Sequence, residues 1–194
     1  MVEQFIRNEK VKGSSPLIGT ILRGIMEIRY KELDLNNEKD KKTMDKIISF
    51  DTTKDCFGDY DFYSVSKDYI NLAIYIKNKL IGYLGFAYTN NKDSTKYTIT
   101  ICIREEYQSL GIGNIVLKQT INTLFNEYNA TSITMEAIES NDKCIKLIEK
   151  NHFSKLKEDT FLKDGEYVKS NVYVYKKRDY KKYLEHLKEY QKIN

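Results

Sequence analysis

One stretch of the chain, residues 98–124, limits the fold more than any other segment of the 194 residues. Residues 98–103 are rich in β-branched side chains, a turn with Gly111 and Gly113 follows, and an amphipathic pattern then continues to Leu124. This order predicts a strand that leads through a tight loop into the N-terminus of a helix. The backbone N–H groups and the positive end of the helix dipole would then face outward together, which favours the binding of a phosphate group.

Three known kinds of glycine-containing loop can be compared with this turn. A P-loop requires a lysine and then a serine or threonine directly after its last glycine, but Asn114 and Ile115 follow Gly113. A dinucleotide-binding turn requires a third glycine at the position where this chain has Val116. The hexad at 108–113, Gln-Ser-Leu-Gly-Ile-Gly, instead resembles the Gln/Arg-x-x-Gly-x-Gly/Ala loop that binds the pyrophosphate of acyl-CoA in the GNAT superfamily of N-acetyltransferases.

A second segment with the same resemblance follows at a suitable distance. Residues 141–153 read Asn-Asp-Lys-Cys-Ile-Lys-Leu-Ile-Glu-Lys-Asn-His-Phe, which is similar to the Asn-x-x-Ala/Ser-x-x-Leu-Tyr-x-Lys-x-Gly-Phe helix of the superfamily. The resemblance covers residues 68–176 well and residues 25–67 only loosely. Because of the Gly-x-Tyr sequence at 165–167, the C-terminal half is most similar to the ribosomal-protein and polyamine branch.

The elements expected along the chain predict a mixed α/β (α+β) fold, a sheet with helices on both faces. Strands are expected at 25–30, 69–76, 79–88, 96–103, 133–138, 160–162 and 168–176, and helices at 38–49, 112–128, 141–151 and 179–191. Residues 51–66 are expected to be irregular or helical. The resemblance implies that the sheet is mostly antiparallel and splayed between its fourth and fifth strands.

We divide the chain into three parts. These are an N-terminal extension (1–24) without assigned structure, an acyl-CoA N-acyltransferase domain (25–176) and a C-terminal helix (177–194). The terminal helix could cover the core or a partner chain, which leaves a homodimer open. Use of the basic segment 176–192 to bind nucleic acid or another protein is a further alternative, although its lysines alternate with glutamates as on a solvated helix.

Composition argues against several other classes of protein. The net charge of +4 is mild, so no nucleic-acid partner is expected. Three cysteines without CxxC spacing and only two histidines argue against a disulfide framework and a metal site. No apolar run approaches the roughly 20 residues of a membrane-spanning helix, and the N-terminus lacks a secretory signal. We therefore expect a cytoplasmic protein without a membrane partner.

The resemblance implies acetyl-CoA as cosubstrate and assigns it a set of binding residues. The pantetheine arm would run along the backbone of Ile101 and Ile103, and a backbone N–H near Ile103 would polarise the thioester carbonyl. The side chain of Asn141 would bind the pantetheine arm, although asparagine also suits a simple helix N-cap. The pyrophosphate would be held by backbone N–H groups of the loop, from Gln108, Ser109, Leu110, Gly111, Ile112 and Gly113.

The catalytic residues are less defined by the sequence. The tyrosine that usually serves the leaving thiolate in this family falls at Ile148, and Cys144 is the nearest candidate to replace it. A small buried residue against the sheet is the alternative role of Cys144. Glu136 is the candidate general base, or else an outward solvated side chain, with Glu139 and Tyr97 as weaker candidates. A water chain without any single base is a further alternative.

The sequence thus predicts transfer of an acetyl group to a primary amine by direct attack on the thioester. The acceptor could be a protein N-terminus, a polyamine or an aminoglycoside-like compound. A non-catalytic acyl-CoA-binding or interaction module on the same fold is the alternative. The segment 51–66 is a candidate acceptor loop, where clustered aspartates would suit a polyamine but also suit a solvated loop; these are Asp51, Asp55, Asp59 and Asp61.

Overall fold

The structure is a computed structural model that describes residues 27–91 and 94–193. The described chain forms one seven-stranded sheet with the strand order β1-β2-β3-β4-β5-β7-β6. All neighbouring strands are antiparallel except β4 and β5, which are parallel. The strands are β1 (Ile28–Glu32), β2 (Ile70–Ile76), β3 (Lys79–Asn91), β4 (Ser94–Ile103), β5 (Ser132–Ile138), β6 (Ser154–Lys163) and β7 (Glu166–Lys176). The predicted mixed, mostly antiparallel sheet is therefore confirmed, while the extension at 1–24 lies outside the described residues.

The sheet splays between its fourth and fifth strands. The register of β4 with β5 ends at the pair Thr98 and Thr134, whose hydroxyl oxygens lie 3.0 Å apart. Beyond that pair, β4 stays paired with β3 as far as Ile103, and β5 stays paired with β7 as far as Ile138. The facing edges of the two strands are consequently separated over their C-terminal halves, and the predicted gap is present.

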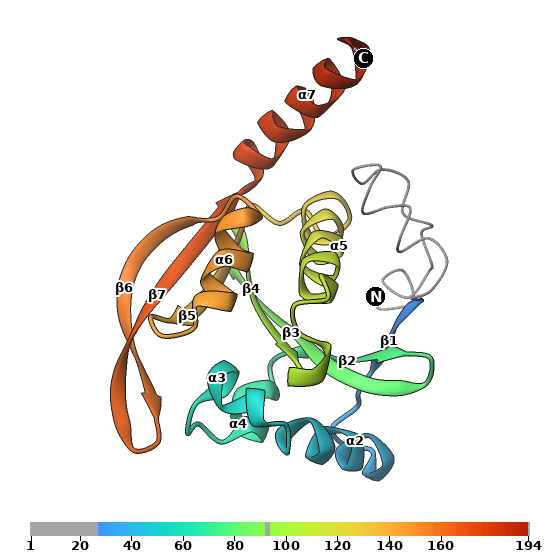
Figure 1. Cartoon of the computed structure of the whole chain (residues 1–194), viewed down its shortest axis with the longest axis vertical. Coiled ribbons are helices and arrows are strands. Elements are labelled where there is room, and N and C mark those ends of the chain that lie inside the picture. Colours follow the sequence, from blue (N-terminus) through green and yellow to red (C-terminus); the bar gives the residue numbers. More distant parts are fainter. Residues whose placement is uncertain (1–26, 92–93, 194) are drawn as a thin grey trace.

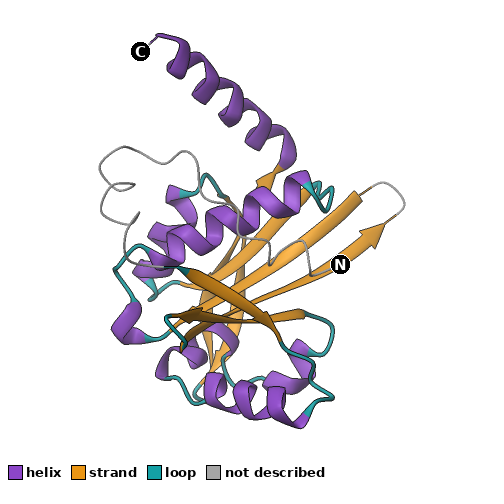
Figure 2. Ribbon diagram, turned by 90° about the vertical axis from the view of Figure 1, so that its right-hand side faces the viewer, coloured by secondary structure: helices purple, strands orange, loops and turns teal. Residues whose placement is uncertain are grey.

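Helices cover both faces of the sheet (Figures 1 and 2). The helices α5 (Ile112–Asn126) and α6 (Asp142–Lys150) lie on one face. The opposite face carries α2 (Glu38–Ile48) and short helical segments, η2 (Asp51–Thr53), α3 (Lys54–Phe57) and α4 (Phe62–Ser66). A single-turn helix, η3 (Glu105–Tyr107), joins β4 to the glycine loop.

Two hydrophobic cores result, because successive side chains of a strand point to opposite faces. On β4, Ile101 and Ile103 pack with the core under α5 and α6, whereas Cys102 is buried in the core under α2 and α3. The first core also contains Ile148, which is fully buried. Position 148 therefore serves the packing of α6 in this chain.

The C-terminal helix α7 (Lys177–Ile193) packs on the body of the domain through its first turns. The ring of Tyr180 is buried and stacks on Phe125 at a centroid distance of 5.0 Å. Ten residues later, Tyr190 is 70% exposed. Helix α7 accordingly extends away from the body of the domain, as Figure 1 shows.

The expected start of the sixth strand was wrong for a physical reason, whereas the expectations for residues 51–66 and for the hairpin at 77–78 were borne out. The sixth strand begins at Ser154 instead of residue 160, because the side chains of its first half are all exposed and give no alternating pattern. The segment 51–66, expected to be irregular or helical, contains η2, α3 and α4. The hairpin at Lys77 and Asn78 is confirmed, with both residues at positive φ as a tight two-residue turn requires.

Candidate active site

The edge of β4 that faces the gap has backbone groups that point into the gap. Near the start of the strand, the carbonyl of Thr95 accepts a hydrogen bond from the segment that leads into β5. The carbonyls of alternate residues further along face the same side, because backbone groups of a strand alternate in direction. There Ile101 O accepts from Cys56 Sγ at 3.4 Å, and Ile103 O accepts from Gln108 Nε2 at 3.0 Å.

This edge is where the sequence placed the pantetheine arm. The structure brings Ile101 and Ile103 to the splayed part of β4, with backbone groups directed into the gap. An extended amide-containing arm could pair with them as an added strand does. Cys56 is a residue of this edge that the sequence analysis missed, because no motif links α3 to a strand that lies more than forty residues later.

The glycine loop ends in an open helix N-terminus. Gly111 is the N-cap residue of α5, with φ 79° and ψ −2°, and no side chain among the described residues caps this helix. A Cβ added at Gly111 would meet no atom within 4 Å. The first N–H groups of α5 therefore lie next to open space, which suits an anion.

The residues of the predicted loop differ in their roles. A Cβ added at Gly113 would lie 3.4 Å from Leu147 Cδ2, so this glycine also permits close packing of α5 on α6. Leu110 and Ser109 are exposed, whereas the side chain of Ile112 is buried in the core. Gln108 is held in place, since its Oε1 accepts a hydrogen bond from Lys143 Nζ at 3.1 Å.

Asn141 has the helix-capping role in the structure. Its Oδ1 accepts a hydrogen bond from the backbone N–H of Cys144 at 3.0 Å, at the N-terminus of α6. This bond satisfies one of the helix donors that lack a partner within the helix. A second role of Asn141 as a ligand of the pantetheine arm remains a proposal.

Cys144 lies one helical turn further along α6 and is half-buried. Burial, together with the negative charge of Asp55, raises the pKa of its thiol to about 11. The thiol is therefore protonated near neutral pH and able to donate a hydrogen bond. Tyr173 on β7 lies near Cys144 and near Asn171, whose buried Oδ1 accepts no hydrogen bond from the described residues.

Glu136 lies on the splayed part of β5, with its side chain exposed. Its Oε1 accepts a hydrogen bond from Ser170 Oγ at 2.5 Å. Tyr69 is hydrogen-bonded to Thr100 and lies close enough to Glu136 to interact with its charge; burial is the main reason that the pKa of Tyr69 is raised. Tyr69 and Ser170 were not found from the sequence. Tyr97, by contrast, lies in the paired part of β4 among aromatic rings.

The aspartates of the candidate acceptor loop mostly serve as structural contacts. Asp55 pairs with Lys163 at 2.6 Å, and an oxygen of Asp59 accepts from the N–H of Gly165 at 2.6 Å. Asp61 caps α4. Together with the pair of Lys54 and Asp164 at 2.7 Å, these contacts fasten α3 to the hairpin of β6 and β7.

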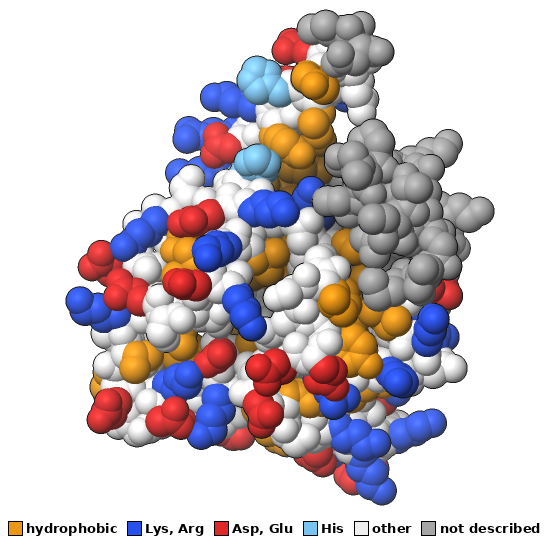
Figure 3. All heavy atoms as spheres, in the orientation of Figure 1, with side chains coloured by type: hydrophobic (Ala, Val, Ile, Leu, Met, Phe, Trp, Pro, Cys, Tyr) orange, Lys and Arg blue, Asp and Glu red, His pale blue; other side chains and the backbone are white. Residues whose placement is uncertain are grey.

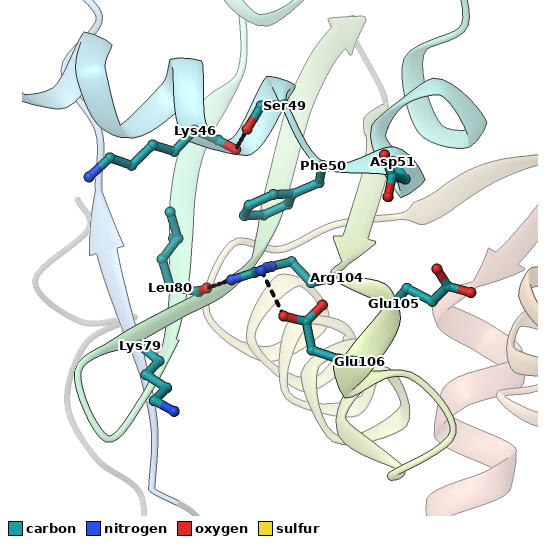
Figure 4. Close-up of a pocket in the computed structure, with 9 residues that line it drawn as sticks. All are labelled: Lys46, Ser49, Phe50, Asp51, Lys79, Leu80, Arg104, Glu105 and Glu106. Carbon is teal, nitrogen blue, oxygen red and sulfur yellow. Dashed lines mark hydrogen bonds and ion pairs between the residues drawn. The ribbon is translucent and has the colours of Figure 1, made fainter.

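Two hollows of the described surface lie near the C-terminal ends of β4 and β5. The larger, about 750 Å³, is lined by residues of α2, β3 and the start of η3, and it lies on the β3 side of β4 (Figure 4). There Arg104 stacks over the Phe50 ring at 5.1 Å and pairs with Glu106 at 2.7 Å. The smaller, about 420 Å³, lies below the tip of the β6–β7 hairpin and includes Ile138 and Ser140.

Positive and negative side chains are interspersed over the face seen in Figure 3. No group of three or more metal-binding side chains occurs among residues 27–91 and 94–193. None of the helices in this part of the chain has the length and apolar character needed to span a bilayer.

Comparison with known proteins identifies the family of this chain. Residues 37–153 match the family described as Acetyltransferase (GNAT) family. An N-alpha-acetyltransferase of Saccharolobus solfataricus is 30% identical over 128 residues, which cover 59% of this chain and 76% of that protein. The chain therefore belongs to the GNAT acetyltransferase family and is an N-acetyltransferase.

Solved structures support the same fold. The ribosomal-protein-S5-alanine acetyltransferase of Vibrio fischeri superposes with a TM-score of 0.65 at 15% identity, covering 78% of this chain and 94% of that one. The spermidine/spermine N-acetyltransferase SpeG of Vibrio cholerae gives a TM-score of 0.63 at 15% identity, covering 79% and 95%. Acetyl-CoA as the cosubstrate follows from the family.

Proposed function

We propose that this protein transfers the acetyl group of acetyl-CoA directly to the primary amine of a protein or peptide N-terminus. The observation that carries the proposal is the gap between β4 and β5, which ends at the open N-terminus of α5. One side of this gap has backbone groups for an extended arm, and its end has N–H groups for a pyrophosphate. The residues present thus fit the cosubstrate that the family uses.

The chain contributes binding and polarisation to the reaction. The N–H groups of residues 108–113 would hold the pyrophosphate, and the edge at Ile101 and Ile103 would align the pantetheine arm. A backbone N–H near Ile103 would donate to the thioester carbonyl as negative charge develops there. Bound acetyl-CoA supplies the activated acetyl group.

Glu136 is the proposed base that receives the ammonium proton of the acceptor. Its exposed carboxylate is oriented by Ser170 and lies near Tyr69. Cys144 is the proposed partner of the leaving thiolate. An ordinary thiol has a pKa of about 8.5. The Cys144 thiol, with a pKa of about 11, would therefore keep its proton and donate a hydrogen bond.

The choice of acceptor rests on two further points. The curated relative acts as an N-alpha-acetyltransferase by its name. Three of the four aspartates that would have made a polyamine site are engaged with Lys163, with Gly165 and with the N-terminus of α4. A polyamine acceptor therefore has less support than a peptide N-terminus.

The test is a CoA-release assay with N-terminal peptides, spermidine and an aminoglycoside, applied to wild type and to Glu136→Gln. We expect turnover with peptides, and a loss of turnover in the variant of about 100-fold without loss of CoA binding. CoA binding without turnover of any acceptor would instead favour the non-catalytic module. Full activity of Glu136→Gln would exclude Glu136 as the base.

A further inference from the structure

Two of the three cysteines of this chain lie next to each other on facing elements. The Sγ of Cys56, on α3, lies 3.4 Å from the carbonyl oxygen of Ile101, the residue before Cys102 on β4. The Sγ of Cys102 lies 3.7 Å from Oγ1 of Thr53, the residue before α3 begins. The backbones agree with this arrangement, since Cα atoms of α3 and β4 approach to within 8 Å. Cys144 is a nearby third thiol that is not bonded to either of them in the structure. These distances define Cys56 and Cys102 as a pair of neighbouring thiols.

The two thiols of the pair have different surroundings. Cys102 is buried, and its Sγ lies 3.3 Å from Thr52 Oγ1 and 3.7 Å from Thr53 Oγ1. The neighbouring Cys56 thiol, helped by these hydroxyls, lowers the pKa of Cys102 although burial acts against it. The neighbouring Cys102 thiol and burial raise the pKa of Cys56, which is half-buried. Cys102 is thus the more acidic thiol of the pair, and Cys56 is the one with access from solvent.

The position of the pair couples it to the gap. Cys56 Sγ donates to the carbonyl of Ile101, on the edge of β4 along which the pantetheine arm would run. The residues before it, Lys54 and Asp55, fasten α3 to the β6–β7 hairpin. A covalent change at Cys56 would therefore act on the edge of the gap, and also on α3 and the β6–β7 hairpin.

We propose that Cys56 and Cys102 are a redox-sensitive pair, and that their oxidation to a disulfide impairs the binding of CoA in the gap. The disulfide stands on the proximity of the two thiols alone, whereas its effect rests on the proposed function. Free Cys56 can leave the Ile101 carbonyl by rotation about χ1 when the pantetheine arm enters. A disulfide removes that freedom and holds the sulfur at the edge of β4.

Hydrogen peroxide is the oxidant that fits a half-buried thiol, because it is small. One sulfur of the pair attacks a peroxide oxygen, the O–O bond breaks, and water leaves. The other sulfur then displaces the oxygen of the resulting sulfenic acid as a second water, and the S–S bond forms. Both S–H bonds are lost, the pair gives up two electrons, and an added dithiol reverses the change.

The first experiment measures the disulfide itself. The full chain is treated with hydrogen peroxide, and its intact mass and free thiols are determined after denaturation, with Cys56→Ser and Cys144→Ser as matched variants. We expect wild type and Cys144→Ser to lose the mass of two hydrogen atoms, and Cys56→Ser to keep its thiols unpaired. A bond to Cys144, a dimer between chains, or oxygen addition without a bond would overturn the proposal.

The second experiment measures the effect on the gap. CoA affinity is determined by calorimetry for reduced, oxidised and re-reduced wild type, and for peroxide-treated Cys56→Ser with confirmed thermal stability. We expect oxidation to weaken binding about tenfold or more, reversibly, in wild type only. Equal affinity of the oxidised form would refute the effect on the gap. Absence of CoA binding in the reduced form would instead refute the proposed function.

Discussion

Two glycines of this chain share one backbone conformation but lie at different places. Gly111, in the loop before α5, and Gly165, at the tip of the β6–β7 hairpin, both have φ 79°. An added Cβ would meet no atom within 4 Å at either position. Replacement of each by alanine therefore introduces the same backbone strain without a steric clash.

The cost to stability follows from the conformation. An L-residue in the left-handed region costs about 1–2 kcal/mol relative to glycine. For a chain of this size, roughly 1 kcal/mol lowers the melting temperature by about 2–4 °C. We expect Gly111→Ala and Gly165→Ala to lose similar amounts of folding stability, because φ and the free space around an added Cβ are the same at the two sites. The hydrogen bond that the backbone N–H of residue 165 donates to the carboxylate of Asp59 is retained when alanine replaces the glycine.

The effect on CoA should separate the two variants. At Gly111 the new methyl group would occupy the open space before the first N–H groups of α5, where the pyrophosphate is proposed to lie. We expect CoA to bind about tenfold more weakly to Gly111→Ala, or roughly 1.4 kcal/mol, and with unchanged affinity to Gly165→Ala. Calorimetric titration with CoA and thermal melting of both variants measure the two quantities.

The paired design makes the result interpretable. Equal CoA affinity in Gly111→Ala and wild type would refute the assignment of this loop as the pyrophosphate site. An equal loss of affinity in both variants would show that backbone strain, and not the methyl group, is responsible.

Three further predictions concern α6 and α7. Asn141→Ala should lower the free energy of unfolding, measured by urea denaturation, by about 1 kcal/mol, whereas Asn141→Ser should keep the helix cap. Weaker CoA binding in both variants would indicate that the amide also binds the pantetheine arm. Tyr180→Ala should destabilise the fold by about 3 kcal/mol, and Tyr190→Ala by much less, because only the first ring is buried. The rate at which iodoacetamide alkylates Cys144, followed by mass spectrometry, should rise with pH up to about 11, because the thiol must first lose its proton. A rate that stops rising at a pH of about 8.5 would contradict the raised pKa.

Local sequence was sufficient for those parts of the site that lie within one strand–loop–helix unit. The change from β-branched residues to glycines predicted the loop, and the helix that starts at Ile112 is the one expected. Asn141 was predicted as a cap or a ligand, and the structure shows the cap. In each case the deciding hydrogen bond or dihedral angle lies within a few residues of the pattern that predicted it.

Contacts between distant segments could not be predicted in the same way. Cys56 meets Ile101, and Asp59 meets Gly165, across 45 and 106 residues. Residues 51–66 carry no pattern that indicates which strand they approach. The first half of β6 was missed for a related reason, since its exposed side chains leave only backbone pairing with β7 to define it.

The gap was predicted from the resemblance to the family and not from the pattern of the two strands themselves. Strands β4 and β5 each read as an ordinary strand, and nothing in either sequence marks Thr98 and Thr134 as their last pair. Their outer neighbours β3 and β7 continue to pair beyond that point, so neither strand loses its other partner. On the exposed edge, the thiol of Cys56 and the amide of Gln108 occupy the carbonyls of Ile101 and Ile103. These donors satisfy backbone acceptors that would otherwise lack a protein partner, and they leave the matching N–H groups for a ligand.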